Sequence, residues 1–533
     1  MKKYLFLIII ISLLALWPFF KKGYFTSHDG EWMVIRFTAF HQTLKAGNFP
    51  VRFTDRLNGN YGYPVLNFLY PLPFYLSEIP KLFGLNFVDS IKIIFTTSAI
   101  FSTLAMFWAL SRKFSIEASL TGGILYLFIP YRFVDLYVRG SIGENLAFAI
   151  IPLILGSIFK IANNKKIYFP LLSFFTALLI LSHNVIAAIF LPILFVLSYF
   201  INRNDFRYVS ISFLLGILSS AFFWLPAIYD LQYVRLSQIS VSNISDHLVP
   251  LSRLFIPSWG YGPTPFGQGA FSPQVGIVAM AVILATLFLR FRSKDKNIIK
   301  DTLILISFIS IFLMSRLSSS FWSAVPFVSV IQFPWRLLSV IVFTASYLVA
   351  FVIDENKYKY KWRLASIIIL ASIISTILYT KPASFVDRPD SFYSTNEDST
   401  TVKDEYLPLW VKEKPVIRAD QKIIINSNNA TINNINIKPN NYKSTINSFE
   451  DIDIFVNTIY FPGWQVKVNG HKTNIDYQNP FGLITFKLPK GNNEVIIQYT
   501  RTPVHLLSEV ISTLALFLTL ACYIKLKWKK QNS

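Results

Sequence analysis

The stretch KKIYFPLLSFFTALLILSHNVIAAIFLPILFVLSYFINR, residues 165–203, decides the fold. It contains two apolar runs, 168–182 and 185–201, each close to the about 17 to 25 residues that cross a bilayer as a helix. Lys165-Lys166 precedes the pair and Arg203 follows it. Because short basic loops are retained on the cytoplasmic side during insertion, the stretch predicts a helical hairpin that turns at the outer face, at His183-Asn184.

The composition of the whole chain agrees with a membrane protein. Of 533 residues 53% are hydrophobic and 15% are charged, with a mean hydropathy of +0.46, whereas soluble domains carry about a quarter charged residues. The net charge of +21 gathers in short segments between apolar runs, so it indicates topology rather than nucleic-acid binding. Cys522 is the only cysteine, which excludes disulfides and cysteine metal sites.

The apolar runs predict about twelve transmembrane helices. The first run follows Lys2-Lys3 and has no small-residue cleavage site, so we expect a retained anchor. This arrangement puts the basic clusters, including Arg290 through Lys300 and Lys357 through Arg363, on one side of a cell (plasma) membrane, with both termini cytoplasmic. The expected spans lie near 4–20, 88–110, 118–130, 145–162, 168–182, 185–201, 208–227, 274–290, 302–316, 335–353, 364–380 and 504–524.

The fold class is therefore a polytopic α-helical membrane protein with a C-terminal extracytoplasmic β-sandwich insert. The bundle covers 1–382 and includes two long outer loops, 21–87 and 228–273. The insert, 383–500, is rich in Asn and Thr and has alternating apolar runs; Asn469-Gly470 is a strong hairpin signal. The last part, 501–533, supplies a final helix and a basic cytoplasmic tail. The hydropathy shows no duplicated halves, which disfavours a transporter built from repeats.

The leading candidate for chemistry is Asp29 in Ser27-His28-Asp29-Gly30-Glu31, just past the first span. An aspartate beside low-dielectric protein is suited to act as a general base or a metal ligand, with His28 and Glu31 beside it. The alternative is that Asp29 caps a helix whose first turn contains Glu31. The two roles are compatible.

Basic residues in the outer loops are the candidates for binding an anion such as a lipid phosphate. Each has a structural alternative: Arg52 and Arg56 pair with Asp55 or with headgroups, and Arg336 extends to headgroups beside Trp335. The candidates are Arg52, Arg56, Arg139 and Arg336.

Glu144 begins a span directly after a short, highly charged loop, which makes it a functional candidate or a helix-start glutamate favoured by the dipole. Other polar and aromatic groups fit substrate binding. For His183 the alternative is a hydrogen-bonded corner, and for Trp410 it is docking of the β domain. The substrate-binding candidates are His28, Tyr63, His183, Asn184, Gln332, Tyr406 and Trp410. Phosphate-loop, dinucleotide, HExxH and GxSxG motifs do not occur.

Several short motifs carry a resemblance to known families. The first outer loop, with Asp29, resembles that of GT-C-type membrane glycosyltransferases. More narrowly, the chain is similar to bacterial membrane proteins called 6-pyruvoyl-tetrahydropterin synthase related, akin to the YfhO family. The motifs are Gly47-Asn-Phe-Pro-Val-Arg52, Gly62-Tyr-Pro64, Arg139-Gly-Ser-Ile-Gly-Glu144, Leu181-Ser-His-Asn184, Gln332-Phe-Pro-Trp-Arg336, Glu405-Tyr-Leu-Pro408 and Tyr460-Phe-Pro-Gly-Trp464.

The resemblance implies transfer of a sugar from a polyprenyl-phosphate-linked donor to a lipid, glycan or protein acceptor on the outer face. It implies that Asp29 is the base or a ligand of a divalent metal, Mg²⁺ or Mn²⁺. Many relatives have an Asp-Glu pair there, whereas this chain has Asp29-Gly30-Glu31. The alternatives are a transporter of lipid-linked glycans and a non-catalytic cell-envelope assembly protein.

Overall fold

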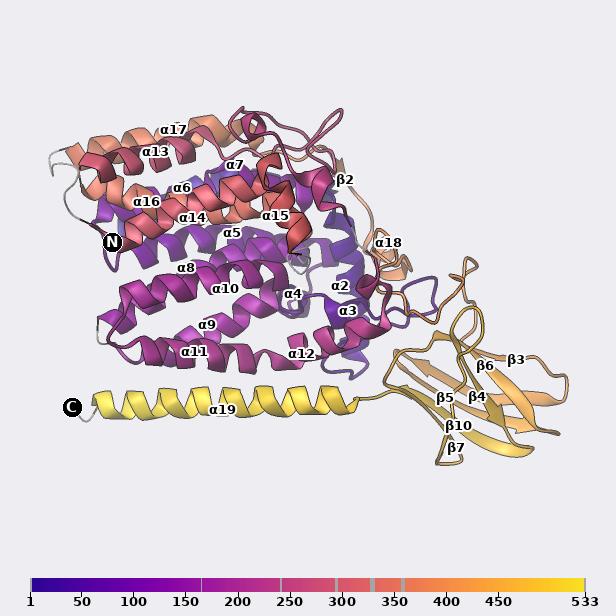
Figure 1. Ribbon diagram of the computed structural model, residues 1–533. Helices are drawn as coiled ribbons and strands as arrows, with labels where there is room; N and C mark the ends of the chain where they lie inside the picture. The colour runs from indigo at the N-terminus through magenta and orange to yellow at the C-terminus, as the bar shows by residue number, and fades with distance from the viewer. Residues whose placement is uncertain are drawn as a thin grey trace.

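The computed structural model describes residues 2–163, 165–239, 242–292, 296–325, 331–355 and 360–531. Parts of two basic clusters, 293–295 and 356–359, lie outside them. The chain forms a helical bundle joined at one end to a β-sandwich, and both termini lie at the opposite end (Figure 1).

Every span expected from the sequence coincides with helix. The corresponding helices are α1 (Lys2–Ala15), α5 (Phe87–Leu110), α6 (Ile116–Leu127), α8 (Ile142–Ala162), α9 (Tyr168–Ser182), α10 (Asn184–Ile201), α11 (Phe206–Ser219) with α12 (Ala221–Asp230), α13 (Ile277–Arg292), α14 (Ile298–Met314), α16 (Leu338–Asp354), α17 (Lys361–Thr376) and α19 (Pro503–Gln531).

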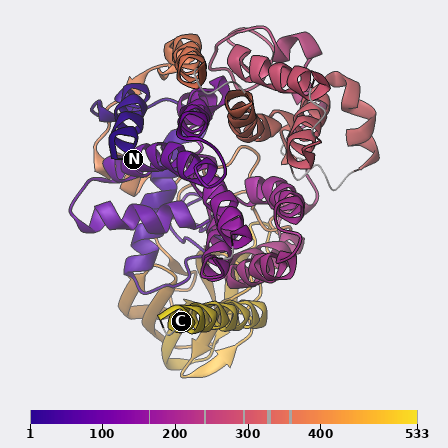
Figure 2. The ribbon, with the colours of Figure 1, turned by 90° about the vertical axis from the view of Figure 1, so that its left-hand side faces the viewer.

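The expected number of twelve spans is not confirmed. Within the described ranges, six helices are long and apolar enough to cross a membrane, and α11 with α12, bent by 63°, would make a seventh. Several of the other helices, such as α1 and α6, are shorter than a bilayer requires. α17 and α19 lie at opposite edges of the bundle, as the end-on view shows (Figure 2).

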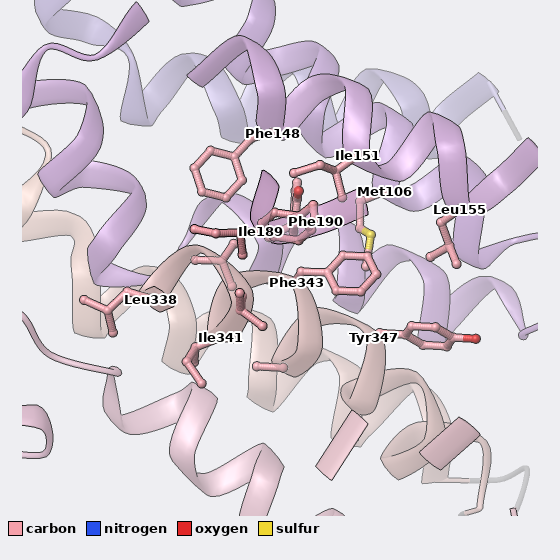
Figure 3. Close-up of a cluster of buried hydrophobic side chains, with 14 of the residues drawn as sticks. Met106, Phe148, Ile151, Leu155, Ile189, Phe190, Leu338, Ile341, Phe343 and Tyr347 are labelled. Carbon is pink, nitrogen blue, oxygen red and sulfur yellow. The ribbon is translucent and has the colours of Figure 1, made fainter. Parts of the chain in front are cut away.

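Small residues let the central helices approach closely. A Cβ on Gly122 of α6 would lie 2.5 Å from the carbonyl oxygen of Ser346 in α16. A Cβ on Gly216 of α11 would lie 2.5 Å from the carbonyl oxygen of Ser173 in α9. Such small-residue contacts are typical of helix packing in membranes, where hydrophobicity alone does not pull helices together. Side chains of α5, α8, α10 and α16 then fill the interior, including Met106, Phe148, Phe190 and Phe343 (Figure 3).

Short helices cover the sandwich end of the bundle. They are α2 (Gly30–Lys45), α3 (Val65–Phe68), α4 (Leu72–Leu82), α7 (Pro130–Phe133), the π-helical turn η2 (Val134–Arg139), α15 (Ser319–Ala324), the 3₁₀ turn η9 (Pro334–Leu337) and α18 (Asp390–Thr395). Two distant segments also pair there: β1 (Tyr24–Phe25) and β2 (Phe385–Val386) form an antiparallel ladder. The segment after the last bundle helix therefore returns to the first outer loop before the sandwich begins.

The sandwich consists of two antiparallel sheets with strand orders β4-β5-β10-β7-β8 and β3-β6-β9. Asn469 and Gly470 join β7 to β8 with φ values of 52° and 80°, which confirms the predicted hairpin. The strands are β3 (Ile423–Ile425), β4 (Ala430–Lys438), β5 (Asn441–Ser448), β6 (Ile452–Ile459), β7 (Trp464–Val468), β8 (His471–Thr473), β9 (Leu483–Leu488) and β10 (Gly491–Tyr499).

Candidate functional site

Two loops meet at the start of α2. The N–H groups of His28 and Asp29 donate to the carbonyl oxygens of Val138 and Arg139, each at 2.9 Å. Gly140 follows with a left-handed φ of 67°, and a Cβ there would lie 2.3 Å from the Ser27 Oγ. Only glycine allows this approach, so the Arg139-Gly140 sequence fixes the position of the Asp29 backbone.

Asp29 occupies the N-cap position of α2, as the structural alternative predicted. Its side chain makes no capping hydrogen bond, and no hydrogen bond to its carboxylate is seen within the described part of the chain. The side chain is half-buried. Asp29 is therefore a carboxylate at a helix N-terminus that remains available to a ligand or a reacting proton.

Arg139 organises a buried network next to Asp29. Its guanidinium donates to Asp135 at 3.1 Å, to the Tyr131 hydroxyl at 3.3 Å and to Glu144. The Tyr131 hydroxyl donates to Glu144 at 2.6 Å. Glu144 is thus an ion-pair partner of Arg139 as well as a residue of the first turn of α8.

Arg336, in η9, is the second guanidinium of the site. It donates to the carbonyl oxygen of Ile331 at 2.9 Å and to Gln332 at 3.1 Å, while its buried Nε has no partner within the described chain. The charges of Asp29, Arg139 and Glu144 all act on this guanidinium, which is only 7% exposed. Residues 29, 139, 144 and 336 therefore converge.

The buried charges of this region are unequal. Four guanidiniums, Arg36, Arg132, Arg139 and Arg336, lie with two carboxylates, Asp135 and Glu144, so the buried cations outnumber the buried anions. A buried excess charge is costly unless an opposite charge comes close. Asp29 supplies part of that compensation, and an anionic ligand would supply more.

His183 lies beside this network at the corner between α9 and α10. Its Nδ1 accepts from the Ile186 N–H at 3.2 Å, and its ring stacks on Tyr70 with centroids 4.7 Å apart. The charges of Arg336, Glu144 and Arg139 all reach its imidazole. The predicted hydrogen-bonded corner is therefore present, within reach of the site. Asn184 is exposed, and its side chain accepts from the neighbouring Val185 N–H.

Tyr406 and Tyr63 lie together on the sandwich side of the site. The Tyr406 N–H donates to the Tyr63 hydroxyl at 3.1 Å, and the Tyr406 ring stacks on Phe68 at 5.1 Å. The charges of Arg36 and Arg336 both act on the Tyr406 hydroxyl. Tyr406 thus borders the site, whereas Tyr63 acts as its support.

The other predicted residues have separate partners. Arg52 pairs with Glu509 of α19 at 3.4 Å, and Arg56 donates to Thr38 at 2.7 Å. The imidazole of His28 lies 3.0 Å from the Tyr261 carbonyl oxygen, and Glu31 pairs with Arg388 at 3.0 Å. Trp410 donates to the Tyr460 carbonyl oxygen and packs on Tyr477. The structure does not bring these five side chains into the network around Arg139.

Sequence analysis missed two residues of the site, Arg36 and Tyr70. Arg36 follows Asp29 by seven residues, two turns of helix, so both lie on one face of α2. That spacing could have identified Arg36 from the sequence. No sequence signal identifies Tyr70, because its position depends on Gly143: a Cβ on Gly143 would lie 2.2 Å from the Tyr70 ring.

A divalent metal would find few protein ligands here. Among the described residues no group of three His, Cys, Asp or Glu side chains is arranged to hold an ion. Mg²⁺ commonly uses one or two carboxylates together with substrate phosphates and water. The Mg²⁺ or Mn²⁺ prediction, with Asp29 as the ligand, stays a prediction.

Comparisons with known proteins identify the family of this chain. The model for the 6-pyruvoyl-tetrahydropterin synthase related domain, described as a membrane protein, matches residues 66–383, and that of the bacterial membrane protein YfhO matches 409–512. The first match includes Arg139, Glu144, His183 and Arg336 but not Asp29. An uncharacterized protein of Lactococcus lactis subsp. cremoris is 25% identical over 293 residues. That alignment covers 51% of this chain and 45% of the relative, so the chain spans less than half of that protein's length.

Solved membrane transferases are more distant. Arabinofuranosyltransferase AftD from Mycobacteria aligns with a TM-score of 0.48 and 11% identity over 73% of this chain and 29% of its own. ArnT from Cupriavidus metallidurans, bound to undecaprenyl phosphate, aligns with a TM-score of 0.43 and 14% identity over 74% and 68%. Since the first family model covers more than half of the residues, this chain belongs to the 6-pyruvoyl-tetrahydropterin synthase related family of membrane proteins.

Proposed function

We propose that this protein is a membrane glycosyltransferase that moves a sugar from a polyprenyl-phosphate-linked donor to a lipid, glycan or protein acceptor. The observation that carries the proposal is a half-buried carboxylate, Asp29, which makes no capping hydrogen bond and whose charge reaches two buried guanidiniums, Arg139 and Arg336. A base beside a phosphate-binding pair is what transfer from a sugar phosphate requires. The motif resemblance to GT-C-type enzymes agrees with this assignment.

In the proposed reaction, an acceptor hydroxyl oxygen forms a bond to the anomeric carbon of the sugar. The bond from that carbon to the phosphate oxygen breaks, and the polyprenyl phosphate leaves with the electron pair. Asp29 takes the proton of the acceptor hydroxyl. Arg139 and Arg336 stabilise the negative charge that grows on the phosphate, and they need little reorganisation because surrounding groups already hold them in place.

Glu144, Asp135 and Gln332 act as positioning residues in this mechanism. Glu144 and Asp135 orient the guanidinium of Arg139, and Gln332 orients that of Arg336. Tyr70, His183 and Tyr406 are the aromatic side chains beside this network that would contact the sugar. A bound Mg²⁺ or Mn²⁺ would add positive charge at Asp29 and the phosphate.

The bundle sets the orientation of the proposed reaction. Both termini and the basic tail of α19 lie at the end opposite the sandwich (Figure 1). We infer from the basic loops that this end is cytoplasmic, so the site and the sandwich face outward. The lipid tail of the donor then stays in the bilayer while its phosphate reaches the Arg139 and Arg336 guanidiniums.

The decisive test is transfer by purified protein in lipid nanodiscs supplied with radiolabelled polyprenyl-phosphate sugars and a cell-envelope extract as acceptor. We expect labelled product from the wild type and at least a 100-fold lower rate from Asp29→Asn, because the amide cannot accept the proton. Asp453→Asn, which removes an exposed carboxylate on β6, is the matched control and should retain full activity.

Three results would contradict the proposal. Equal transfer by Asp29→Asn and wild type would remove Asp29 as the base. Movement of the lipid-linked sugar across liposomes without any change in its bonds would favour the transporter alternative. Full complementation by Asp29→Asn, together with loss of function on deletion of 383–500, would favour a non-catalytic assembly protein.

A further inference from the structure

A cavity lies between the first outer loop and the open side of the sandwich, apart from the Asp29 site. Its volume is about 700 Å³, within the about 300 to 1,000 Å³ of ordinary ligand sites. Four isoleucines form its apolar floor, and polar groups of the first outer loop and of the segment before β3 form its walls. The lining includes Ile423, Ile432, Ile435, Ile437, Asp55, Arg56, Asn60, Asp420, Lys422 and Lys438.

A β-bulge creates the apolar floor. The register of β4 against β5 shifts between Ile432 and Asn434, so Ile432 pairs with Ile446 and Ile437 pairs with Tyr442. Ile446 and Tyr442 are fully buried and belong to the inner face of the sandwich. The bulge therefore turns Ile432, Ile435 and Ile437 toward that same inner face.

This inner face is not covered at β4. The sheet that contains β4 has five strands and the facing sheet has three, and Ile435 is 52% exposed although it lies on the inner face. β4 is also an edge strand whose ladder, in the part of the chain that is described, runs to β5 alone. The only charged residue of β4 is Lys438 at its end, whereas natural edge strands usually carry charges or proline that prevent pairing with another chain.

The polar walls have a positive excess. Three cations, Arg56, Lys422 and Lys438, face two anions, Asp55 and Asp420, which leaves one positive charge. The Nε of Arg56 is buried without a partner among described atoms, although its two terminal nitrogens are engaged. A ligand that brings an acidic group would satisfy this nitrogen.

We propose that the cavity binds an extended polypeptide segment of another protein, which adds a strand to the free edge of β4. Alternate apolar side chains of the segment would rest on Ile432, Ile435 and Ile437, and an acidic residue would reach Arg56. An open edge with a side-chain pocket beside it is the arrangement that strand addition uses: the main chain provides affinity and the pocket provides selectivity. Binding here is independent of the transfer chemistry at Asp29.

The test is selection from a random nonapeptide display library on the full chain in nanodiscs. We expect the wild type to enrich peptides that alternate apolar and polar residues and contain an acidic residue. Ile435→Asp, which places a charge on the floor, should lower binding of these peptides at least tenfold. Asn436→Asp is the matched control: it adds the same charge one position along β4, on the opposite face, and should bind as the wild type does.

Chemical variation of an enriched peptide tests the pairing itself. N-methylation of alternate amides on the pairing edge should lower affinity at least tenfold, because the methyl groups block strand pairing. Arg56→Gln, a variant outside the apolar floor, should remove the preference for the acidic residue while keeping the apolar alternation. It serves as the second variant if Ile435→Asp lowers the unfolding temperature.

Four results of the binding experiments each overturn the proposal: no enrichment on the wild type, equal binding by Ile435→Asp, equal binding of the N-methylated peptide, or displacement of peptide by neutral oligosaccharides. The last would identify a glycan site. A wild-type dimer that Ile435→Asp converts to monomer would identify a second copy of this chain as the occupant and would also overturn it.

Discussion

At the scale of single residues, Gly140 determines whether Asp29 is in place. Gly140→Ala forces an alanine into a left-handed φ, which costs about 1 to 2 kcal/mol, and also drives a Cβ against Ser27. We expect a lower unfolding temperature and at least a tenfold loss of transfer activity, measured by thermal denaturation in detergent and by the sugar-transfer assay. Gly84→Ala is the control, because Gly84 has a φ of 87° and open space around its Cα. Equal effects of the two substitutions would rule out the loop contact as the cause.

Lys422 gives the sandwich a pH dependence. Burial lowers the pKa of its ammonium from 10.5 to about 8. Between these values the unfolded chain binds the proton and the folded chain does not, so stability rises with pH from about 8 to 10.5, by on the order of 3 kcal/mol. Denaturant unfolding followed by tryptophan fluorescence at pH 7.5 to 10.5 should show this rise in the wild type and not in Lys422→Met. A wild-type curve that falls over this range would contradict it.

At the scale of elements, an ion pair between Arg52 and Glu509 joins the first outer loop to the final helix. Arg52 is 5% exposed and pairs with Glu509 at the start of α19, and removal of one partner of a buried pair costs about 3 to 5 kcal/mol. Glu509→Gln should therefore loosen α19 from α11 and α12. Cys522, which packs near Leu215 further along α19, is a native probe whose alkylation by N-ethylmaleimide should become faster. Glu494→Gln, on the exposed side of β10, should leave the rate unchanged.

The helices themselves could be predicted from the sequence because each apolar run carries its own signal. The Asn469-Gly470 hairpin was predictable for the same reason: two adjacent residues that tolerate positive φ decide the turn. The pairing of Arg52 with Glu509 was not, since it joins residues 457 positions apart. Arg52 was therefore expected at a donor phosphate, and the structure places it against the last helix.

The candidate site, too, could be predicted from the sequence only in part. Asp29, Arg139, Glu144 and Arg336 could be selected because charged residues are rare beside apolar spans. Which of them meet depends on close approaches at Gly140 and Gly143. A sequence pattern does not encode those contacts, so it does not tell that Arg56, one of the four anion-binding candidates, lies apart from this network while Arg139 and Arg336 lie within it.

At the scale of the whole molecule, the topology can be tested in intact cells. In a Cys522→Ser background, we expect Asp453→Cys to react with a membrane-impermeant maleimide, because the sandwich lies at the end proposed to be outside. Lys527→Cys, near the end of α19, should react only after the cells are opened. Labelling of Lys527→Cys alone in intact cells would reverse the proposed orientation, and labelling of both positions would contradict a single orientation.

The ladder between β1 and β2 has a consequence for synthesis. Their pairing extends to a hydrogen bond between the hydroxyls of Thr26 and Ser384, which are separated by 358 positions. At about 5 to 20 residues per second, a ribosome needs roughly 20 to 70 s to make the second strand after the first. During that time the segment that leads into Asp29 has no partner strand, so in a chain released before residue 385 only the contacts with Val138 and Arg139 would hold the proposed base. The proposed transfer activity would then reach its full level only once synthesis has passed the bundle and the molecule is nearly complete.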